Sequence, residues 1–277
     1  MLFTPSWITD ALPSNSKIQV AHYTRIGTLR YFTDQAKPGG WCSVWATPVQ
    51  FLNDRKELSL GLDTLSRVAN QPPYSGHRVR LTLDSLINLG VEPDLDPYQV
   101  SFSGNVDELG QWRGYAANGM GCSVVTKTAD VQRVADVAGW VIYDARKQLA
   151  FARKILQTLR KQTDVAIIEQ VLIASACFMK DKGFEPEAEF RLLKFPTPGH
   201  VQFRESGDRL VPYIDVLATA APLPIIKVIV GPGWQLSELL PDAFARHHVV
   251  QGIHRLLTAR GMPGDNIHSS TIPYDPK

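Results

Sequence analysis

Residues 144–182 contain neither proline nor glycine, although the whole chain has 19 prolines and 20 glycines. Apolar side chains recur in this segment at the three- and four-residue intervals of an amphipathic helix. They are Leu149, Ala152, Leu156, Leu159, Ile168, Leu172 and Ala176. The segment is long for one helix, and we predict two helices with a break near Thr163-Asp164.

Shorter elements are predicted on both sides of this helical segment. Alternating or β-branched runs predict strands at 18–23, 41–46, 98–103, 122–125, 190–195, 213–217 and 225–230. Helical patterns cover 24–32 with Thr24 as cap, 54–69, 109–116 and 238–260, while 78–88 is ambiguous. Strands and helices alternate irregularly, which favours an α+β fold over a doubly wound one. We expect a mixed, mostly antiparallel sheet with flanking helices, in a single domain over 1–277 that has 144–182 inserted or packed against the sheet.

Net charge and cysteine spacing indicate which partners and which cellular compartment to expect. A net charge of +2 is too balanced to imply that phosphate backbones or anionic lipids dominate binding. Cys42, Cys122 and Cys177 lie far apart and lack metal or disulfide spacing, so we interpret them as reduced thiols. The N-terminus does not resemble a secretory signal, and no run approaches ~20 apolar residues. We expect a soluble, cytoplasmic protein that makes no membrane contact.

Three polar segments lie at predicted strand ends, where sheet proteins often place function. They are His22-Tyr23-Thr24, Ser101-Phe102-Ser103 and Glu187-Ala188-Glu189, and the aromatic residues Trp112 and Tyr115 follow the second. Serine hydroxyls beside aromatic rings suit a nucleotide or nicotinamide ring. Two carboxylates two residues apart in an extended stretch share a face and repel each other.

Each segment also has a structural interpretation. The histidine can bond to backbone while Thr24 caps a helix, and the second segment can be a strand covered by an aromatic helix. The third can be a solvated acidic edge in which Glu189 and Arg191 form a surface pair of little energetic value.

Several common enzyme motifs are missing from the sequence. It contains no G-x-x-x-x-G-K-[ST], no G-x-G-x-x-G after a strand, no H-E-x-x-H and no G-x-S-x-G. The ordinary ATPase, dehydrogenase, metalloprotease and hydrolase interpretations therefore lose support.

The ordered segments HYT, WATPVQFLNDRKE, SFS, QWRGYAANGMG, EPEAEFRLL, IKVIVGP and SSTIPY resemble a widespread bacterial family of uncharacterised domains. They run from His22 to Tyr274. The family's FNDP appears here as Leu52-Asn53-Asp54-Arg55, and its final Arg after Pro-Tyr is Asp275. That family is distantly similar to the ADP-ribosyltransferase fold, in which residues from three strands surround NAD.

The resemblance implies NAD as a substrate and an oxocarbenium-like transition state. Glu189 would stabilise that cation, Glu187 would accept a proton or shape the acceptor site, and Ser103 would orient Glu189. The resemblance also implies a set of NAD-binding residues, namely His22, Tyr23, Thr24, Ser101, Ser103, Trp112 and Tyr115. Among them, His22 would hydrogen-bond a ribose or amide group, and Tyr23 or Trp112 would stack on nicotinamide. Arg25, Arg113 or Arg191 would meet the pyrophosphate.

The resemblance requires no metal, and the acceptor would be a protein or nucleic acid, as in toxins or phage-defence enzymes. Two other hypotheses stay open. One is a non-enzymatic nucleotide-binding or sensor domain. The other is a metal-dependent nuclease that uses Asp54, Glu57, Glu187 and Glu189.

Overall fold

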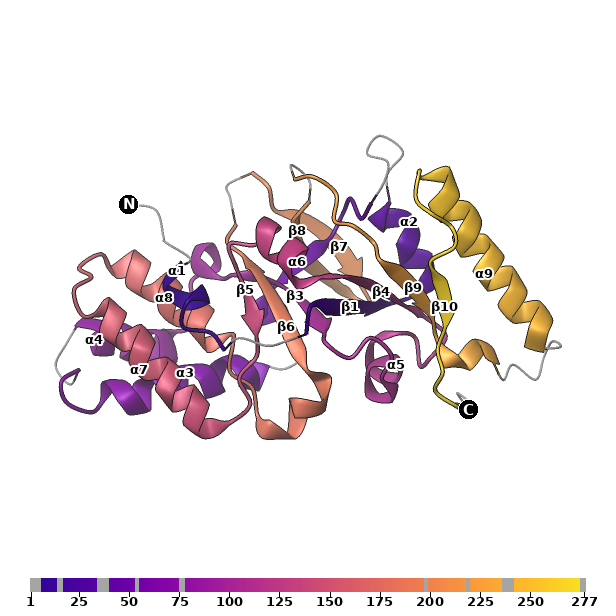
Figure 1. Cartoon of the computed structure of the whole chain (residues 1–277). Helices are drawn as coiled ribbons and strands as arrows, with labels where there is room; N and C mark the ends of the chain where they lie inside the picture. The colour runs from indigo at the N-terminus through magenta and orange to yellow at the C-terminus, as the bar shows by residue number, and fades with distance from the viewer. Residues whose placement is uncertain are drawn as a thin grey trace. The chain divides into compact units, whose positions relative to one another are not determined.

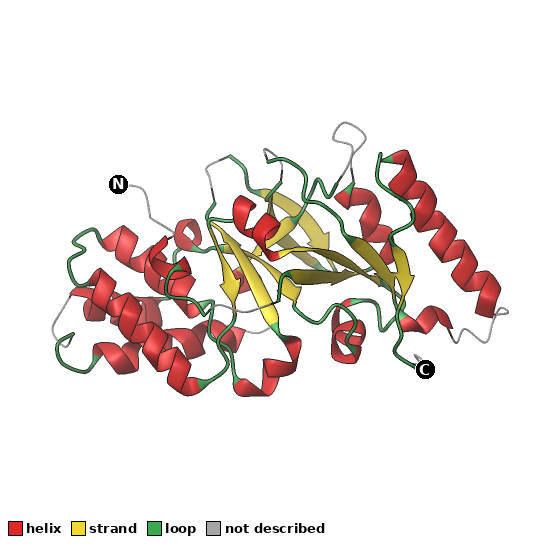
Figure 2. Ribbon diagram, in the orientation of Figure 1, coloured by secondary structure: helices red, strands yellow, loops and turns green. Residues whose placement is uncertain are grey.

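The computed structural model describes residues 6–13, 17–33, 40–52, 55–74, 78–196, 199–217, 220–235 and 242–274. It has the predicted α+β architecture, with a mixed, mostly antiparallel sheet and flanking helices (Figure 1, Figure 2). The chain divides into two compact units. The first unit comprises Met1–Asn15, Trp45–Val100 and Ala135–Ile214, and the second comprises Ser16–Val44, Ser101–Val134 and Asp215–Lys277. The prediction of a single domain over 1–277 stays a prediction.

The first unit contains most of the long helices. Its helices are α1 (Ser6–Thr9), α3 (Arg55–Ala69), α4 (Arg78–Leu89), α7 (Ala145–Leu159) and α8 (Val165–Ala176), with 3-10 turns η2 (Val49–Phe51), η3 (Pro93–Leu95) and η4 (Lys182–Glu187). Its strands are β2 (Trp45–Pro48), β5 (Val137–Trp140), β6 (Glu189–Lys194), β7 (Gln202–Ser206), β8 (Arg209–Asp215) and the start of β3 (Tyr98–Ser103). Here β2 lies between β3 and β8, β7 lies beside β8, and β5 pairs with β6 antiparallel.

Helix α8 is central to the helical core of the first unit. Helix α3 packs against α4, α7 and α8, and residues 171–176 of α8 are buried throughout (Figure 1). A Cβ on Gly61 of α3 would lie 2.4 Å from the carbonyl oxygen of Ala176, so only glycine allows this close approach. The predicted break between two helices is confirmed, because Asp164 caps α8 by accepting hydrogen bonds from the backbone N–H groups of Ala166 and Ile167.

The second unit is mainly a five-strand arrangement. Its strand order is β10 (Ile267–Ser269), β9 (Lys227–Val230), β4 (Cys122–Lys127), β1 (Gln19–Thr24) and the end of β3, and the one parallel pair among these is β9 with β10. Its helices are η1 (Ile26–Thr28), α2 (Leu29–Phe32), α5 (Leu109–Tyr115), α6 (Thr128–Val134), η5 (Pro232–Gln235) and α9 (Asp242–Ala259). Helix α5 packs on β1, α6 on β4, and α9 on β10.

Asp107 anchors the C-terminal segment within the second unit. Its Oδ1 accepts hydrogen bonds from the indole of Trp112 at 2.7 Å and the hydroxyl of Ser270 at 2.6 Å. Its Oδ2 accepts two more from Thr271, at 2.9 Å from the backbone N–H and 3.1 Å from the hydroxyl. Burial works to raise the pKa of Asp107, but these hydrogen bonds outweigh it and hold the pKa below its usual range.

Local predictions fail at several element ends. Thr24 does not cap a helix, because β1 still pairs it with Cys122 and the turn η1 begins from Arg25 without a side-chain cap. The strand predicted at 41–46 begins only at Trp45, while Trp41 forms an isolated bridge to Leu223. Strands β5, β7 and β10 and helix α6 were not predicted. All four are short, and β5 and β10 are stabilised by pairing with strands far along the chain, β6 and β9.

No helix among the described residues is long and apolar enough to cross a membrane. Cys42, Cys122 and Cys177 are buried.

Asp96, in the first unit, is a buried carboxyl. It is 4% exposed, its Oδ2 is 3.4 Å from the backbone N–H of Gln50, and its Oδ1 has no hydrogen-bond partner among the described residues. Burial raises its pKa from 3.8 to about 7. The folded state therefore holds a proton that the unfolded chain releases between those two pH values.

The free energy of unfolding of the wild type should consequently fall as pH rises from about 4 to about 7, and level off above that. Asp96→Asn should be more stable than wild type at pH 8 by roughly 2–4 kcal/mol, since one pKa unit is worth about 1.4 kcal/mol. Urea unfolding at pH 5 and pH 8 measures the difference. The exposed Asp94→Asn is the matched control, and an equal response of both variants to pH would contradict the prediction.

Candidate functional site

The nine predicted site residues divide between the two units. Glu187 and Glu189 belong to the first unit, at the junction of η4 and β6. The other seven, His22 to Thr24, Ser101, Ser103, Trp112 and Tyr115, belong to the second unit.

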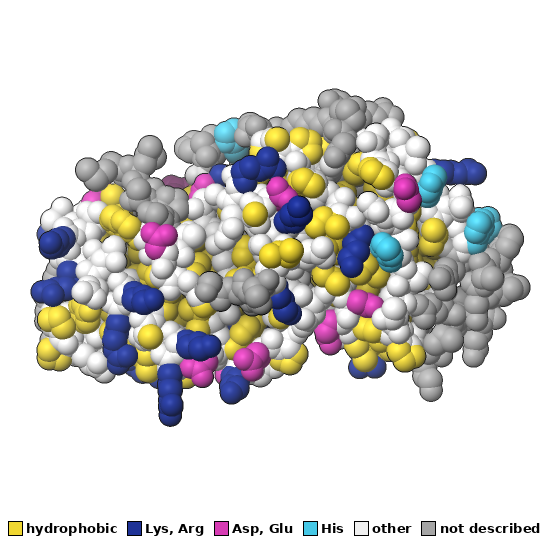
Figure 3. Space-filling model, viewed as in Figure 1, with side chains coloured by type: hydrophobic (Ala, Val, Ile, Leu, Met, Phe, Trp, Pro, Cys, Tyr) yellow, Lys and Arg dark blue, Asp and Glu magenta, His cyan; other side chains and the backbone are white. Residues whose placement is uncertain are grey.

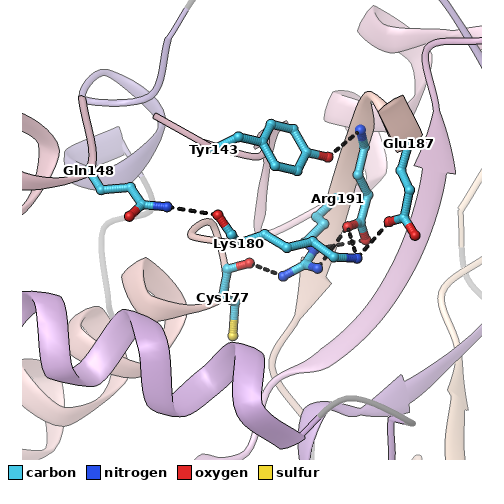
Figure 4. A network of polar contacts seen from close by, with 7 residues as sticks. Tyr143, Gln148, Cys177, Lys180, Glu187 and Arg191 are labelled. Atoms are coloured by element: carbon cyan, nitrogen blue, oxygen red, sulfur yellow. Dashed lines mark hydrogen bonds and ion pairs between the residues drawn. The ribbon is translucent and has the colours of Figure 1, made fainter. Parts of the chain in front are cut away.

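Glu189 belongs to a buried ion cluster with Lys180 and Arg191, both of which are labelled in Figure 4. Its Oε1 accepts a hydrogen bond from Nε of Arg191 at 2.8 Å, and its Oε2 accepts one from Nη2 of the same residue at 2.7 Å. Nζ of Lys180 lies 3.2 Å from the same Oε2. Glu189, Arg191 and Lys180 are 6%, 2% and 4% exposed. Glu189 and Arg191, which were predicted to form a weak surface pair, therefore form a buried, bidentate ion pair. Its geometry and the low local dielectric strengthen each contact.

Glu187 reaches the same ammonium group by a different backbone path. Its Oε2 lies 2.6 Å from Nζ of Lys180, and 22% of its side chain is exposed. The prediction of an extended stretch is wrong here, because Glu187 ends the 3-10 turn η4 and Ala188 has left-handed backbone angles, φ 44° and ψ 52°. This turn, rather than strand alternation, directs the two carboxylates at one cation.

Hydrogen bonds from three neighbouring segments hold the cluster in place. Arg191 Nη1 donates to the carbonyl of Cys177, just after α8, and the backbone N–H of Glu189 donates to the hydroxyl of Tyr143 at 2.9 Å (Figure 4). Gln148 of α7 donates to the carbonyl of Lys180 at 2.9 Å. The ring of Phe184 lies 4.7 Å from Nζ of Lys180, within cation–π range. The cluster thus joins α7, the end of α8, η4, β6 and the segment between β5 and α7.

The charges of this cluster balance, with two carboxylates and two cations. Glu189 has both oxygens engaged by cations, so its charge is already compensated within the protein. Glu187 differs, since 22% of its side chain is exposed. Of the two predicted carboxylates, Glu187 has the geometry better suited to contact a substrate.

His22 lies within a group of aromatic rings in the second unit. The ring centres of Phe32, Trp41 and Phe102 lie 5.9, 5.8 and 5.9 Å from that of His22. Its Nδ1 is 3.1 Å from the carbonyl oxygen of Ser101, and because a carbonyl only accepts, Nδ1 carries the proton. Burial lowers the pKa of His22, although the bond to Ser101 works to raise it. The neutral ring therefore presents Nε2 as an acceptor.

Two of the other predicted residues in this unit are core residues. Trp112 is 0% exposed, and its ring centre lies 4.8 Å from that of Tyr23. The Tyr23 hydroxyl donates to the carbonyl of Asn105 at 2.7 Å and accepts from the N–H of Glu108 at 3.1 Å. These contacts pack α5 onto β1.

The remaining four differ in exposure. Ser103 is buried, and its hydroxyl accepts a hydrogen bond from the backbone N–H of Asn105 at 3.0 Å. Thr24 is also buried. Ser101 and Tyr115 are exposed, Tyr115 at 53%, so these two are accessible to a ligand.

The alternative metal site cannot be traced fully in the structure. Asp54 and the side chain of Glu57 lie outside the described residues. Among the side chains that are described, no group of three or more His, Cys, Asp or Glu is placed to hold a metal ion. The nuclease hypothesis stays a prediction.

Of the partners of the two carboxylates, Arg191 was predicted from the sequence, whereas Lys180 and Tyr143 were not. One signal was available in the sequence, because Lys180 directly follows residues 171–179, which are apolar apart from Ser175. A lysine in such a position is rarely buried without a charged partner.

The comparisons with known proteins concern the middle of the chain. Residues 111–192 match the model of a family described as a protein of unknown function, DUF2971. The match supports the predicted similarity to an uncharacterised domain family, and it covers Tyr143, Lys180, Glu187, Glu189 and Arg191. No curated protein and no solved structure shows a significant match to this chain.

Removing the central cation should destabilise the first unit. Lys180→Met leaves two carboxylates with one cation in a buried cluster, and should lower the free energy of unfolding by roughly 3 kcal/mol. Adding Glu187→Gln to that variant should restore part of the loss, because it removes one uncompensated charge. Urea denaturation of the single and double variants measures the coupling. Lys182→Met, an exposed neighbour, should change stability by less than about 0.5 kcal/mol. Equal effects of the Lys180 and Lys182 substitutions would show that the cluster is not stabilising.

The imidazole of His22 should titrate below the ordinary histidine value of 6.5. Since protonation is disfavoured in the folded state, the His22 contribution to stability is present above pH 6.5 and is lost as pH falls below it. NMR titration of the ring protons, assigned with His22→Gln, measures the pKa directly. Phe32→Leu admits water beside the ring and should raise that pKa. A wild-type value at or above 6.5 would disprove the proposed environment.

Proposed function

We propose that this protein uses NAD as a substrate and breaks the bond between nicotinamide and ribose, passing the ADP-ribosyl group to a macromolecular acceptor or to water. The observation that carries the proposal is the convergence of Glu187 and Glu189 on Nζ of Lys180 at 2.6 and 3.2 Å. A carboxylate pair at the start of a late strand is what the resemblance to ADP-ribosyltransferases implies. The ADP-ribosyltransferase-like fold is part of this proposal.

The chemistry requires a negative charge beside a developing cation. When the bond between ribose C1′ and nicotinamide N1 breaks, its electron pair leaves with nicotinamide and positive charge spreads over C1′ and the ring oxygen. A fixed carboxylate stabilises that charge without reorganising. The oxygen of the acceptor then bonds to C1′ and gives its proton to a carboxylate or to water.

The geometry suggests a division of roles between the two carboxylates. Arg191 holds Glu189 at both oxygens, so we assign Glu189 to positioning Lys180 and, through it, Glu187. We assign the substrate contact to Glu187, whose side chain is partly exposed. In the alternative, which the sequence suggested, Glu189 itself stabilises the cationic transition state. Variants of Glu187 and Glu189 distinguish the two assignments.

Within the second unit itself, two of the predicted residues carry groups suited to a nucleotide. Nε2 of neutral His22 is suited to accept a hydrogen bond from a ribose hydroxyl. Tyr115 is exposed and offers a ring face for stacking, whereas Trp112 and Tyr23 serve the packing of α5 on β1.

Release of nicotinamide from NAD, followed by chromatography, tests the proposal. Glu187→Gln should reduce kcat about 10²- to 10³-fold with little change in KM, because the lost contact forms mainly in the transition state. Glu185→Gln is the matched control, since it removes the same charge from an exposed position of η4 and should keep full activity. Glu189→Gln should reduce kcat less than Glu187→Gln does. A larger loss with Glu189→Gln would return the substrate contact to that residue.

A second candidate is a nucleotide-binding or sensor domain without turnover, and the charge balance around Glu189 favours it. NAD or ADP-ribose would then raise the melting temperature while wild type releases no nicotinamide. That pair of results would overturn the enzymatic proposal. Unchanged nicotinamide release in both glutamate variants would overturn the assignment of either carboxylate.

A further inference from the structure

Helix α7 carries a regular row of positive charge that the proposed function does not use. Residues 145–163 contain six basic residues and no aspartate or glutamate. They occur as three adjacent pairs spaced seven residues apart, Arg146-Lys147, Arg153-Lys154 and Arg160-Lys161. A surface helix ordinarily intersperses acidic and basic side chains, so this composition is unusual for a merely solvated face.

All three pairs lie on the outer face of the helix. The inner face is buried against α3 and α8, through Gln148, Phe151, Ala152, Ile155, Leu156 and Leu159. The six basic residues are all exposed. Arg160 follows the last helical residue and keeps helical backbone angles, φ −54° and ψ −32°, so the row continues past Leu159. In the space-filling view, Lys and Arg side chains gather on the face over α7 (Figure 3).

The spacing aligns the charges while limiting their mutual repulsion. Seven residues correspond to about 10.5 Å of rise, with a drift of only ~20° around the axis. The pairs therefore form a nearly straight row of about 21 Å. Positions four residues from a cation are never basic in this segment, so like charges do not meet along the helix.

We propose that this outer face of α7 binds the phosphate backbone of double-stranded nucleic acid. Double-stranded DNA carries one phosphate charge per about 1.7 Å of axis over its two strands, so each cation pair in a row of about 21 Å has phosphates within reach. No aromatic side chain is exposed on this face, where Ala145, Ala150, Gln157 and Thr158 accompany the cations. Single-strand binding relies on stacked aromatic rings, so the face suits a duplex. Since it contacts backbone only, binding is independent of base sequence.

The inference rests on the charge row alone, and it is tested without NAD. A labelled 20-base-pair DNA duplex is titrated with the full chain at several salt concentrations by fluorescence anisotropy. The logarithm of the binding constant should fall with the logarithm of salt concentration with a slope of about −5, corresponding to about five or six phosphate contacts. Arg153→Gln/Lys154→Gln should make the slope shallower by about 2 and weaken binding at least tenfold at low salt.

The matched control removes the same charge from elsewhere on the surface. Lys127→Gln/Arg209→Gln changes two exposed residues outside α7 and should leave both slope and affinity nearly unchanged. Glutamine keeps high helix propensity, and far-ultraviolet circular dichroism confirms that α7 is intact. Equal weakening in both double variants would overturn the proposal, since net charge rather than α7 would then govern binding. Binding to single strands or anionic vesicles but not to duplex would overturn it as well.

Discussion

The buried ion cluster around Lys180 is the interaction on which the first unit depends. Removing a carboxylate or an ammonium group from water costs several kcal/mol per ion, and only good mutual geometry offsets it. Lys180, Glu189 and Arg191 are each less than a tenth exposed, so a small displacement of any one leaves a buried charge uncompensated. The end of α8, the turn η4 and the start of β6 are therefore fixed relative to one another. Any ligand chemistry at Glu187 starts from this rigid base.

Elements with strong local signals could be predicted from the sequence. Strand β3 has the predicted bounds of 98–103, and the break between α7 and α8 falls at the aspartate expected there. Periodicity and capping are properties of neighbouring residues, so they can be recognised from the sequence without knowledge of the fold. Short strands such as β5 and β10 escaped prediction because partners far along the chain stabilise them.

The site was predicted only in part for the same reason. Glu187 and Glu189 were singled out, yet their cation Lys180 was not, because no residue spacing marks a pair that a turn creates. Asp107 was missed in the second unit, since its partners Ser270 and Thr271 lie more than 160 residues away. A hydrogen-bonding hub of this kind has no local signature. Its sequence looks like any polar loop until tertiary structure supplies the donors.

Bulk charge is a similarly incomplete guide to binding. The chain has a net charge of +2, and because residues 145–163 carry +6, the remainder carries −4. Screening at physiological ionic strength limits electrostatic influence to about 8 Å, far less than the length of α7. A polyanion at the outer face of that helix therefore experiences the local row of cations rather than the near-neutral average. The net charge of +2, which is too balanced to imply phosphate binding, therefore conceals an excess of six positive charges in residues 145–163. The helical register places these charges on one face.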